Sequence, residues 1–165
     1  MFKVGEYVIY RRDLCQIKKV EEKYYTLNPV MDETLSIKVL IENKSNYLRP
    51  PITKTEAFNL IQKIPSIQPL QANEKMLENE YKNLLRTNLH EDLIKIIKTT
   101  YLRNENRRNS GKKLSDKDLI YFNMAEKYLY TELAYALGKT DEECKKYIIE
   151  LLEKANQKEK LDSDE

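Results

Sequence analysis

The hydrophobic period of this chain changes at Arg49-Pro50-Pro51-Ile52, and this change constrains the fold more than any other feature. Before it, β-branched and aromatic residues alternate with polar ones, a pattern typical of strands with one buried face. After it, apolar residues recur as on one face of an amphipathic helix. Two consecutive prolines donate no backbone hydrogen bonds and hold the chain extended, so a strand must end there. The sequence therefore predicts two domains, over residues 1–52 and 53–156, followed by a frayed acidic tail over 157–165.

The first domain is predicted to be a small β-barrel. Its strand-like segments are Tyr7–Tyr10, Leu14–Val20, Tyr24–Leu27 and Leu35–Ile41. Four or five strands this short cannot form an open sandwich within about fifty residues, so a Tudor- or SH3-like barrel is the expected solution. Most of the aromatic residues are then expected in its thin core.

The second domain is predicted to be an all-α bundle of about five helices, since glycines are scarce in the chain. The expected helices are Lys54–Lys63, Asn73–Arg86, one that follows Asn88 or His90 and runs to about Asn104, one from Ser115 to Leu137, and a last one after Thr140. Thr53 with Glu56 fits a capping box, and Gly138 suits the end of the fourth helix. That helix is apolar nearly all round and is expected at the centre of the bundle.

Cations gather from the middle of the third expected helix to the start of the fourth. They are Lys95, Lys98, Arg103, Arg107, Arg108, Lys112, Lys113 and Lys117. Only Glu105 and Asp116 oppose them within this stretch. Such a concentration can be a phosphate footprint, or it can be the solvated end of a helix and a loop. Charge alone leaves both interpretations open.

Groups that could perform catalysis are scarce. The single histidine, His90, has no evident orienting partner, so we expect it to cap a helix or lie at the surface. Cys15 and Cys144 are expected to be reduced, unpaired and buried. The chain has no phosphate-binding glycine loop, HExxH motif or nucleophile elbow. We therefore expect a binding protein that is not an enzyme and holds no cofactor and no metal.

Hydropathy gives no sign of a membrane protein. No stretch of the chain approaches the ~20 apolar residues that a membrane-spanning helix needs. The first residues also lack the pattern of a signal peptide. We expect a cytoplasmic protein without a membrane partner.

Four segments, taken in order, carry a resemblance to a known family. They are Phe2–Tyr10, Leu48–Lys54, Glu80–Lys82 and Thr131–Gly138. In order and spacing they resemble the CarD/CdnL family of bacterial transcription regulators, whose N-terminal half is shared with transcription–repair coupling factors. The resemblance implies a monomer with a Tudor-like barrel that binds the RNA polymerase β subunit. It also implies a helical domain that contacts promoter DNA at the upstream edge of the transcription bubble and modulates open-complex stability and initiation.

By position, the resemblance assigns polymerase contacts to Lys23 and Lys38. The alternative for each is an ordinary solvated lysine. It assigns a DNA phosphate contact to Lys82, and Leu77 stands where the family has a tryptophan wedge, with Met76 beside it. The alternative for Leu77 is core packing. Three arginines would extend the DNA-binding surface, namely Arg103, Arg107 and Arg108.

The segment after Tyr10 departs from the family pattern. The family usually has a proline and a glycine-bearing turn there, whereas this chain has Arg11-Arg12-Asp13-Leu14-Cys15, so the first hairpin must use another turn type. Two other functions stay open. One is a polymerase-binding adaptor that makes no productive DNA contact, and the other is a stand-alone nucleic-acid-binding protein.

Overall fold

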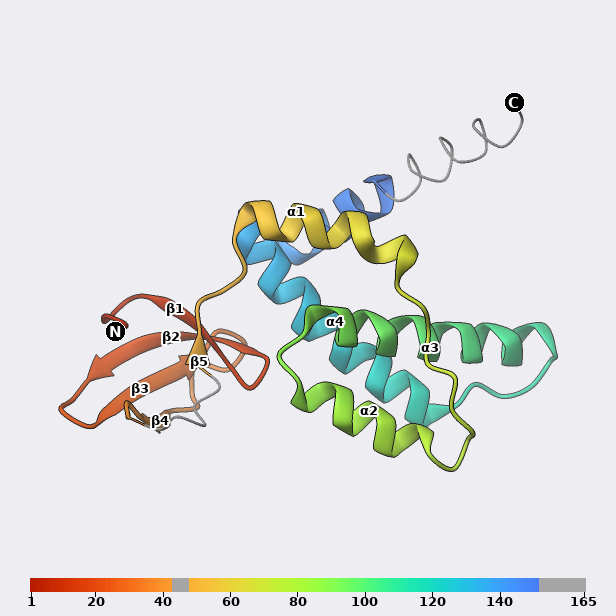
Figure 1. Ribbon diagram of the computed structural model, residues 1–165, viewed down its shortest axis with the longest axis horizontal. Coiled ribbons are helices and arrows are strands. Elements are labelled where there is room, and N and C mark those ends of the chain that lie inside the picture. Colours follow the sequence, from red (N-terminus) through yellow and green to blue (C-terminus); the bar gives the residue numbers. More distant parts are fainter. Residues whose placement is uncertain (43–47, 152–165) are drawn as a thin grey trace. The chain divides into compact units, whose positions relative to one another are not determined.

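The computed structural model describes residues 1–42 and 48–151 and divides into two compact units, Met1–Pro51 and Ile52–Glu165. We call them the strand unit and the helical unit (Figure 1). The division falls between Pro51 and Ile52, within the segment where the hydrophobic period changes. The tail expected over 157–165 lies outside the described residues.

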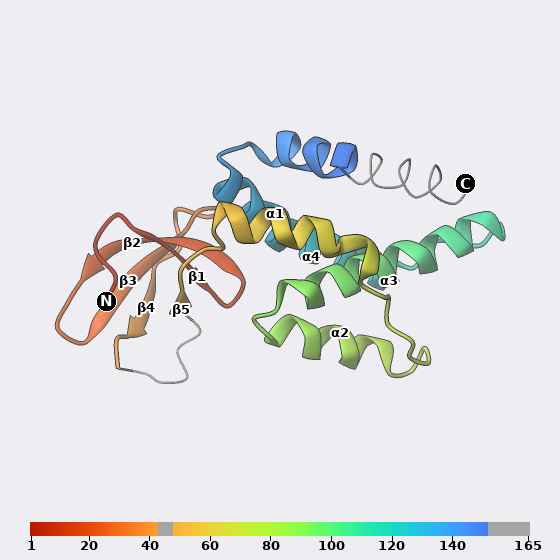
Figure 2. The ribbon, with the colours of Figure 1, turned by 45° about the horizontal axis from the view of Figure 1, so that its top comes forward.

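The strand unit is a five-stranded antiparallel sheet in the order β4-β3-β2-β1-β5. Its strands are β1 (Tyr7–Tyr10), β2 (Asp13–Val20), β3 (Tyr24–Pro29), β4 (Ile37–Leu40) and β5 (Leu48–Arg49). The sheet curls into a half-barrel (Figure 2). The prediction of several short strands followed by helices is confirmed, with β4 shorter than the segment expected from the sequence.

Alternate residues of the strands form the core of the strand unit. The buried members are Val8, Cys15, Ile17, Tyr25, Leu27 and Val39. Tyr25 is paired with Val39 across β3 and β4, whereas Thr26 is paired with Lys38. Because side chains alternate between the two faces of a strand, Lys38 lies on the outer face of the half-barrel.

The first hairpin uses a two-residue turn of Arg11 and Arg12 between Tyr10 and Asp13. Both arginines have positive φ, 48° and 77°, which fits the type I′ turn that matches the twist of a hairpin. The sequence does not predict this turn, because asparagine and glycine are its usual residues. Arg12 is buried, and the guanidinium of Arg11 lies over the ring of Tyr10 at 5.2 Å.

The helical unit contains α1 (Lys54–Lys63), the short 3₁₀ helix η1 (Ile64–Ser66), α2 (Leu77–Arg86), α3 (His90–Asn109), α4 (Asp116–Leu137) and a further helix over 141–151. Helices α3 and α4 make the most extensive contact within it. All the α-helices contribute side chains to one apolar core. It includes Leu60, Ile61, Tyr81, Leu93, Ile96, Leu133 and Ile148.

Helix ends follow the capping signals of the sequence. Thr53 and Glu56 form both hydrogen bonds of the predicted capping box. The Ser115 hydroxyl accepts from the Asp118 amide at the start of α4, and Gly138 takes the left-handed conformation at its end. The Thr140 hydroxyl accepts from the Glu143 amide at the start of the last helix. The caps predicted at Thr53 and Gly138 are confirmed.

Two helices differ in length from the expectation. Helix α2 begins at Leu77 rather than Asn73, because the Asn73 carbonyl and side chain both accept from the Met76 amide and close a turn before the helix. Helix α3 continues to Asn109, past the expected end near Asn104. Nothing breaks the helix before Gly111, whose φ is +69°.

Candidate phosphate-binding site

A buried carboxylate joins three helices and fixes the first arginine of the site. Asp118 on α4 accepts a hydrogen bond from the Tyr81 hydroxyl of α2 at 3.1 Å. Its other oxygen accepts from Arg103 Nε of α3 at 2.9 Å. The Tyr81 ring also packs against Tyr121 with ring centroids 5.1 Å apart. Burial, together with the neighbouring carboxylate, raises the pKa of Tyr81, so the hydroxyl stays protonated and donates to Asp118.

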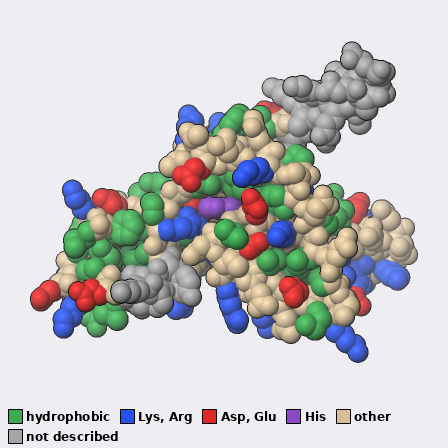
Figure 3. All heavy atoms as spheres, viewed as in Figure 1, with side chains coloured by type: hydrophobic (Ala, Val, Ile, Leu, Met, Phe, Trp, Pro, Cys, Tyr) green, Lys and Arg blue, Asp and Glu red, His purple; other side chains and the backbone are tan. Residues whose placement is uncertain are grey.

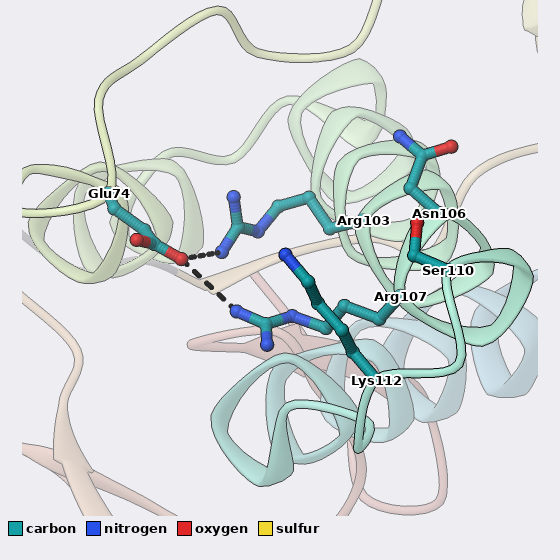
Figure 4. A pocket seen from close by; sticks show the side chains of 6 residues that line it. All are labelled: Glu74, Arg103, Asn106, Arg107, Ser110 and Lys112. Atoms are coloured by element: carbon teal, nitrogen blue, oxygen red, sulfur yellow. Dashed lines mark hydrogen bonds and ion pairs between the residues drawn. The ribbon is translucent and has the colours of Figure 1, made fainter.

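Arg103 and Arg107 lie one turn apart on α3 and converge on one anionic oxygen. The Nη2 atoms of the two arginines lie 3.0 Å and 3.1 Å from the same Oε1 of Glu74 (Figure 4). The surrounding hollow has a volume of about 370 Å³. Asn106, Ser110 and Lys112 complete its lining.

The positive charges around the hollow favour an anion within it. The hydrogen bond from Arg103, and then the charges of Arg103, Arg107 and Lys112, hold the pKa of Glu74 below its usual range. The Glu74 carboxylate is therefore ionised at neutral pH. Guanidinium groups that converge on one oxygen provide charge-assisted hydrogen bonds of the kind that recognise carboxylates and phosphates. The chemistry of this arrangement is binding rather than proton transfer.

Most of the other clustered cations have partners of their own. The structure gives the pairs Lys95–Asp92 at 3.5 Å, Arg108–Glu105 at 2.9 Å, Lys113–Asp116 at 3.9 Å and Lys117–Glu78 at 3.0 Å. Lys98 instead donates to the carbonyls of Ile64 and Ile67, and burial lowers its pKa. Figure 3 likewise shows Lys and Arg interspersed with Asp and Glu on the face in view. The candidate phosphate site is the hollow, because Arg103, Arg107 and Lys112 are the members of the cluster that line it together.

The expected wedge is not at the surface. Leu77 is only 4% exposed and packs in the core of the helical unit, so in this structure its side chain is not available to a DNA groove. The assignment of Leu77 as a wedge is therefore corrected to core packing, because its position begins the buried face of α2. Met76 is 47% exposed. Lys82 is exposed, with its Nζ 3.8 Å from Glu78.

The two lysines assigned to polymerase occupy different settings in the strand unit. Lys38 is exposed on β4, which pairs with β3 and with no other strand of the described residues. Lys23 lies in the turn before β3, not on a strand, and its carbonyl accepts from the Ile41 amide at 2.9 Å. The exposed Tyr24 and Leu40 are paired with each other across the two strands. Since they stand an even number of residues from Thr26 and Lys38, they share the outer face with Lys38.

His90 has an orienting partner that the sequence does not reveal. Its Nε2 lies 2.9 Å from Glu132 Oε1, and the other Glu132 oxygen accepts from the Ile52 amide at 2.8 Å. Glu132 is buried. The expectation of a partnerless histidine was wrong because Glu132 lies 42 residues further along the chain. Through Glu132, these two contacts link Ile52, at the start of the helical unit, to α3 and α4.

Within residues 1–42 and 48–151, no His, Cys, Asp and Glu side chains gather in a group that could hold a metal ion. None of the helices described there has the length and apolar character to cross a membrane. Neither the comparison with protein-family models nor that with curated proteins finds a match for this chain.

Proposed function

We propose that the chain is a bacterial transcription regulator of the CarD/CdnL type. Its strand unit, a Tudor-like barrel, binds the β subunit of RNA polymerase. Its helical unit contacts promoter DNA near the upstream edge of the transcription bubble and changes the stability of the open complex. The proposal rests on the ordered resemblance of four sequence segments and on one structural observation in each unit.

The observation that carries the proposal is the edge strand β4. In the described residues β4 pairs with β3 and with no other strand, so it is an edge strand, the kind of element to which a partner can add a strand of its own. Lys38, Tyr24 and Leu40 lie on the adjoining outer face, where a cation and two apolar side chains can select the partner. Strand addition of this kind derives affinity from the backbone and specificity from such side chains.

The DNA contact would come from the hollow around Arg103 and Arg107. Two guanidinium groups that meet at one oxygen suit a backbone phosphate, which positions a protein without reading sequence. Few phosphate contacts give weak and salt-sensitive binding. Once the strand unit is docked on polymerase, however, the DNA is present at a high effective concentration, and a weak contact can then shift the equilibrium between closed and open promoter.

The experiment that tests the polymerase contact is retention of purified RNA polymerase by the immobilised full chain. We expect the wild-type chain and Lys3→Glu to retain polymerase, because Lys3 is an exposed lysine outside the strands. Lys38→Glu should lose most of the retention while its circular dichroism spectrum stays unchanged. Failure of the wild-type chain to retain polymerase would overturn the proposed function.

A polymerase-binding adaptor without a productive DNA contact is the second candidate. It is favoured by the burial of Leu77 and by the occupation of both arginines by Glu74. Charge reversal at Lys82 and Arg107 distinguishes the two functions. An unchanged lifetime of the promoter complex in this double variant, with polymerase binding retained, would favour the adaptor. Arg107 is chosen over Arg103 because Arg103 also bonds the buried Asp118.

A further inference from the structure

We propose that Glu74 is a built-in competitor for the phosphate position between Arg103 and Arg107. A DNA phosphate would then bind the helical unit only by displacing this carboxylate. The inference deepens the proposed function and rests on it, because it concerns how the same arginines are regulated. The ligand is a phosphodiester of the DNA backbone.

The geometry of the hollow supports competition for one position. A single Glu74 oxygen receives both arginine Nη2 atoms, at 3.0 Å and 3.1 Å. A phosphate oxygen forms the same charge-assisted bonds with guanidinium groups at similar lengths. Carboxylate and phosphate oxygens cannot occupy this position together, and like charges so close would repel each other. Lys112 and Ser110 line the rest of the hollow, where further phosphate oxygens can find donors.

The two arginine side chains are held in place more firmly than the Glu74 side chain. Arg103 is held in place because its Nε donates to the buried Asp118, and the Tyr81 hydroxyl donates to the same carboxylate. Arg107 lies on the same helix, and both arginine side chains are about two-thirds buried or more, at 27% and 32% exposed. The Glu74 side chain is 69% exposed and comes from the turn before α2. Glu74 can therefore leave while the arginines stay in position.

Such a competitor would make binding depend on how the DNA is presented. When only a fraction of the protein is in the binding-competent state, the apparent dissociation constant rises by the inverse of that fraction. DNA free in solution would therefore bind poorly. DNA held beside the protein by polymerase reaches effective concentrations in the millimolar range, which allows it to displace Glu74. The carboxylate would thus weaken the binding of free DNA, while DNA at the higher effective concentration of the assembled complex still binds.

The test is the affinity of the full chain for a fluorescently labelled DNA duplex, measured by anisotropy over a series of salt concentrations. Glu74→Gln keeps the shape of the side chain and removes its charge. We expect this variant to bind about three- to tenfold more tightly than wild type, the range expected when two partly exposed ion pairs no longer compete with DNA. The logarithmic salt dependence should also steepen by about one unit for each additional phosphate that the variant neutralises. Adding Arg107→Gln should abolish the increase in affinity.

Glu142→Gln is the matched control, because it removes one exposed negative charge from the helical unit at a site outside the hollow. If Glu74→Gln and Glu142→Gln bind DNA with equal affinity, Glu74 does not compete for the phosphate position. If Arg107→Gln nevertheless weakens binding, the DNA contact itself is retained. If no variant binds DNA, titration with inorganic phosphate followed by phosphorus NMR tests whether Glu74 competes with a phosphate group. Tighter phosphate binding by Glu74→Gln would then support the competitor, and the promoter contact is tested separately by the lifetime of the promoter complex. Equal phosphate binding would overturn the competitor as well.

Discussion

Replacement of Asp118 by alanine tests the network that fixes Arg103. The substitution removes two hydrogen bonds to a buried carboxylate, one from Tyr81 and one from Arg103. It leaves the Tyr81 hydroxyl buried without its acceptor and the Arg103 guanidinium without its inner partner. A hydrogen bond to a charged group contributes about 1.5–3 kcal/mol, and removal of one partner from a buried ion pair costs about 3–5 kcal/mol. We therefore expect Asp118→Ala to lower the free energy of unfolding of the helical unit by about 3–5 kcal/mol.

Tyr81→Phe should cost less, about 1–3 kcal/mol, because it deletes one of these bonds and keeps the ring packed against Tyr121. In the double variant the losses should not add, since both substitutions remove the same hydrogen bond. Asp116→Ala is the control. It removes another acidic residue from the first turn of α4, but the Asp116 side chain is exposed, and among the described residues its one ion pair is with Lys113 at 3.9 Å.

The assay is urea unfolding followed by far-ultraviolet circular dichroism, a signal that the helices dominate and that therefore reports the helical unit. The shift of the transition midpoint should be large for Asp118→Ala, intermediate for Tyr81→Phe and small for Asp116→Ala. A shift for Asp118→Ala no larger than that for Asp116→Ala would refute the anchoring of Arg103.

Three further outcomes follow from single residues. Thr53→Ala removes the capping box of α1 and should lower the free energy of unfolding by about 1 kcal/mol in the same urea assay. Gly138→Ala places a side chain at a φ of +65° with no atom within 4 Å of the new methyl group, so backbone strain alone should cost about 1 kcal/mol. Burial, with a contribution from Asp13, raises the pKa of Cys15 to about 12 from 9.0. Its contribution to stability should therefore be complete below pH 9 and decline as pH rises from 9 toward 12. Alkylation of Cys15 by iodoacetamide should accordingly be slow at pH 8 and become fast in urea; rapid alkylation of the folded chain would contradict this.

Features set by neighbouring residues could be predicted from the sequence. The caps at Thr53, Ser115 and Gly138 involve partners within a few positions, so their residue types mark the helix ends directly. The alternation along β3 and β4 likewise revealed which residues face inward. The turn at Arg11 and Arg12 was the local exception, because its two left-handed residues are not of the types that usually mark a type I′ turn.

Features set by distant residues could not be predicted. The partner of Arg103 and Arg107 is Glu74, 29 and 33 residues earlier, in a turn that the sequence pattern assigned to a helix. The resemblance places Leu77 at a wedge position with core packing as the alternative, and the burial that decides between them depends on where α2 packs. The hydrophobic period gives the faces of each helix and not the pairing of charges between helices. The arginines could therefore be predicted as site residues, whereas their ion pairs with a carboxylate could not be predicted.

The most direct test of the bridging role is the lifetime of open promoter complexes formed by RNA polymerase with the wild-type chain, Lys38→Glu, Arg107→Glu and the double variant. The wild-type chain should change the lifetime, by roughly tenfold for a differential binding free energy of about 1.4 kcal/mol. Each single variant should remove most of this effect. The double variant should do no more than either, because both contacts are needed to bridge polymerase and DNA. An effect of the wild-type chain that survives intact in both single variants would contradict the bridge.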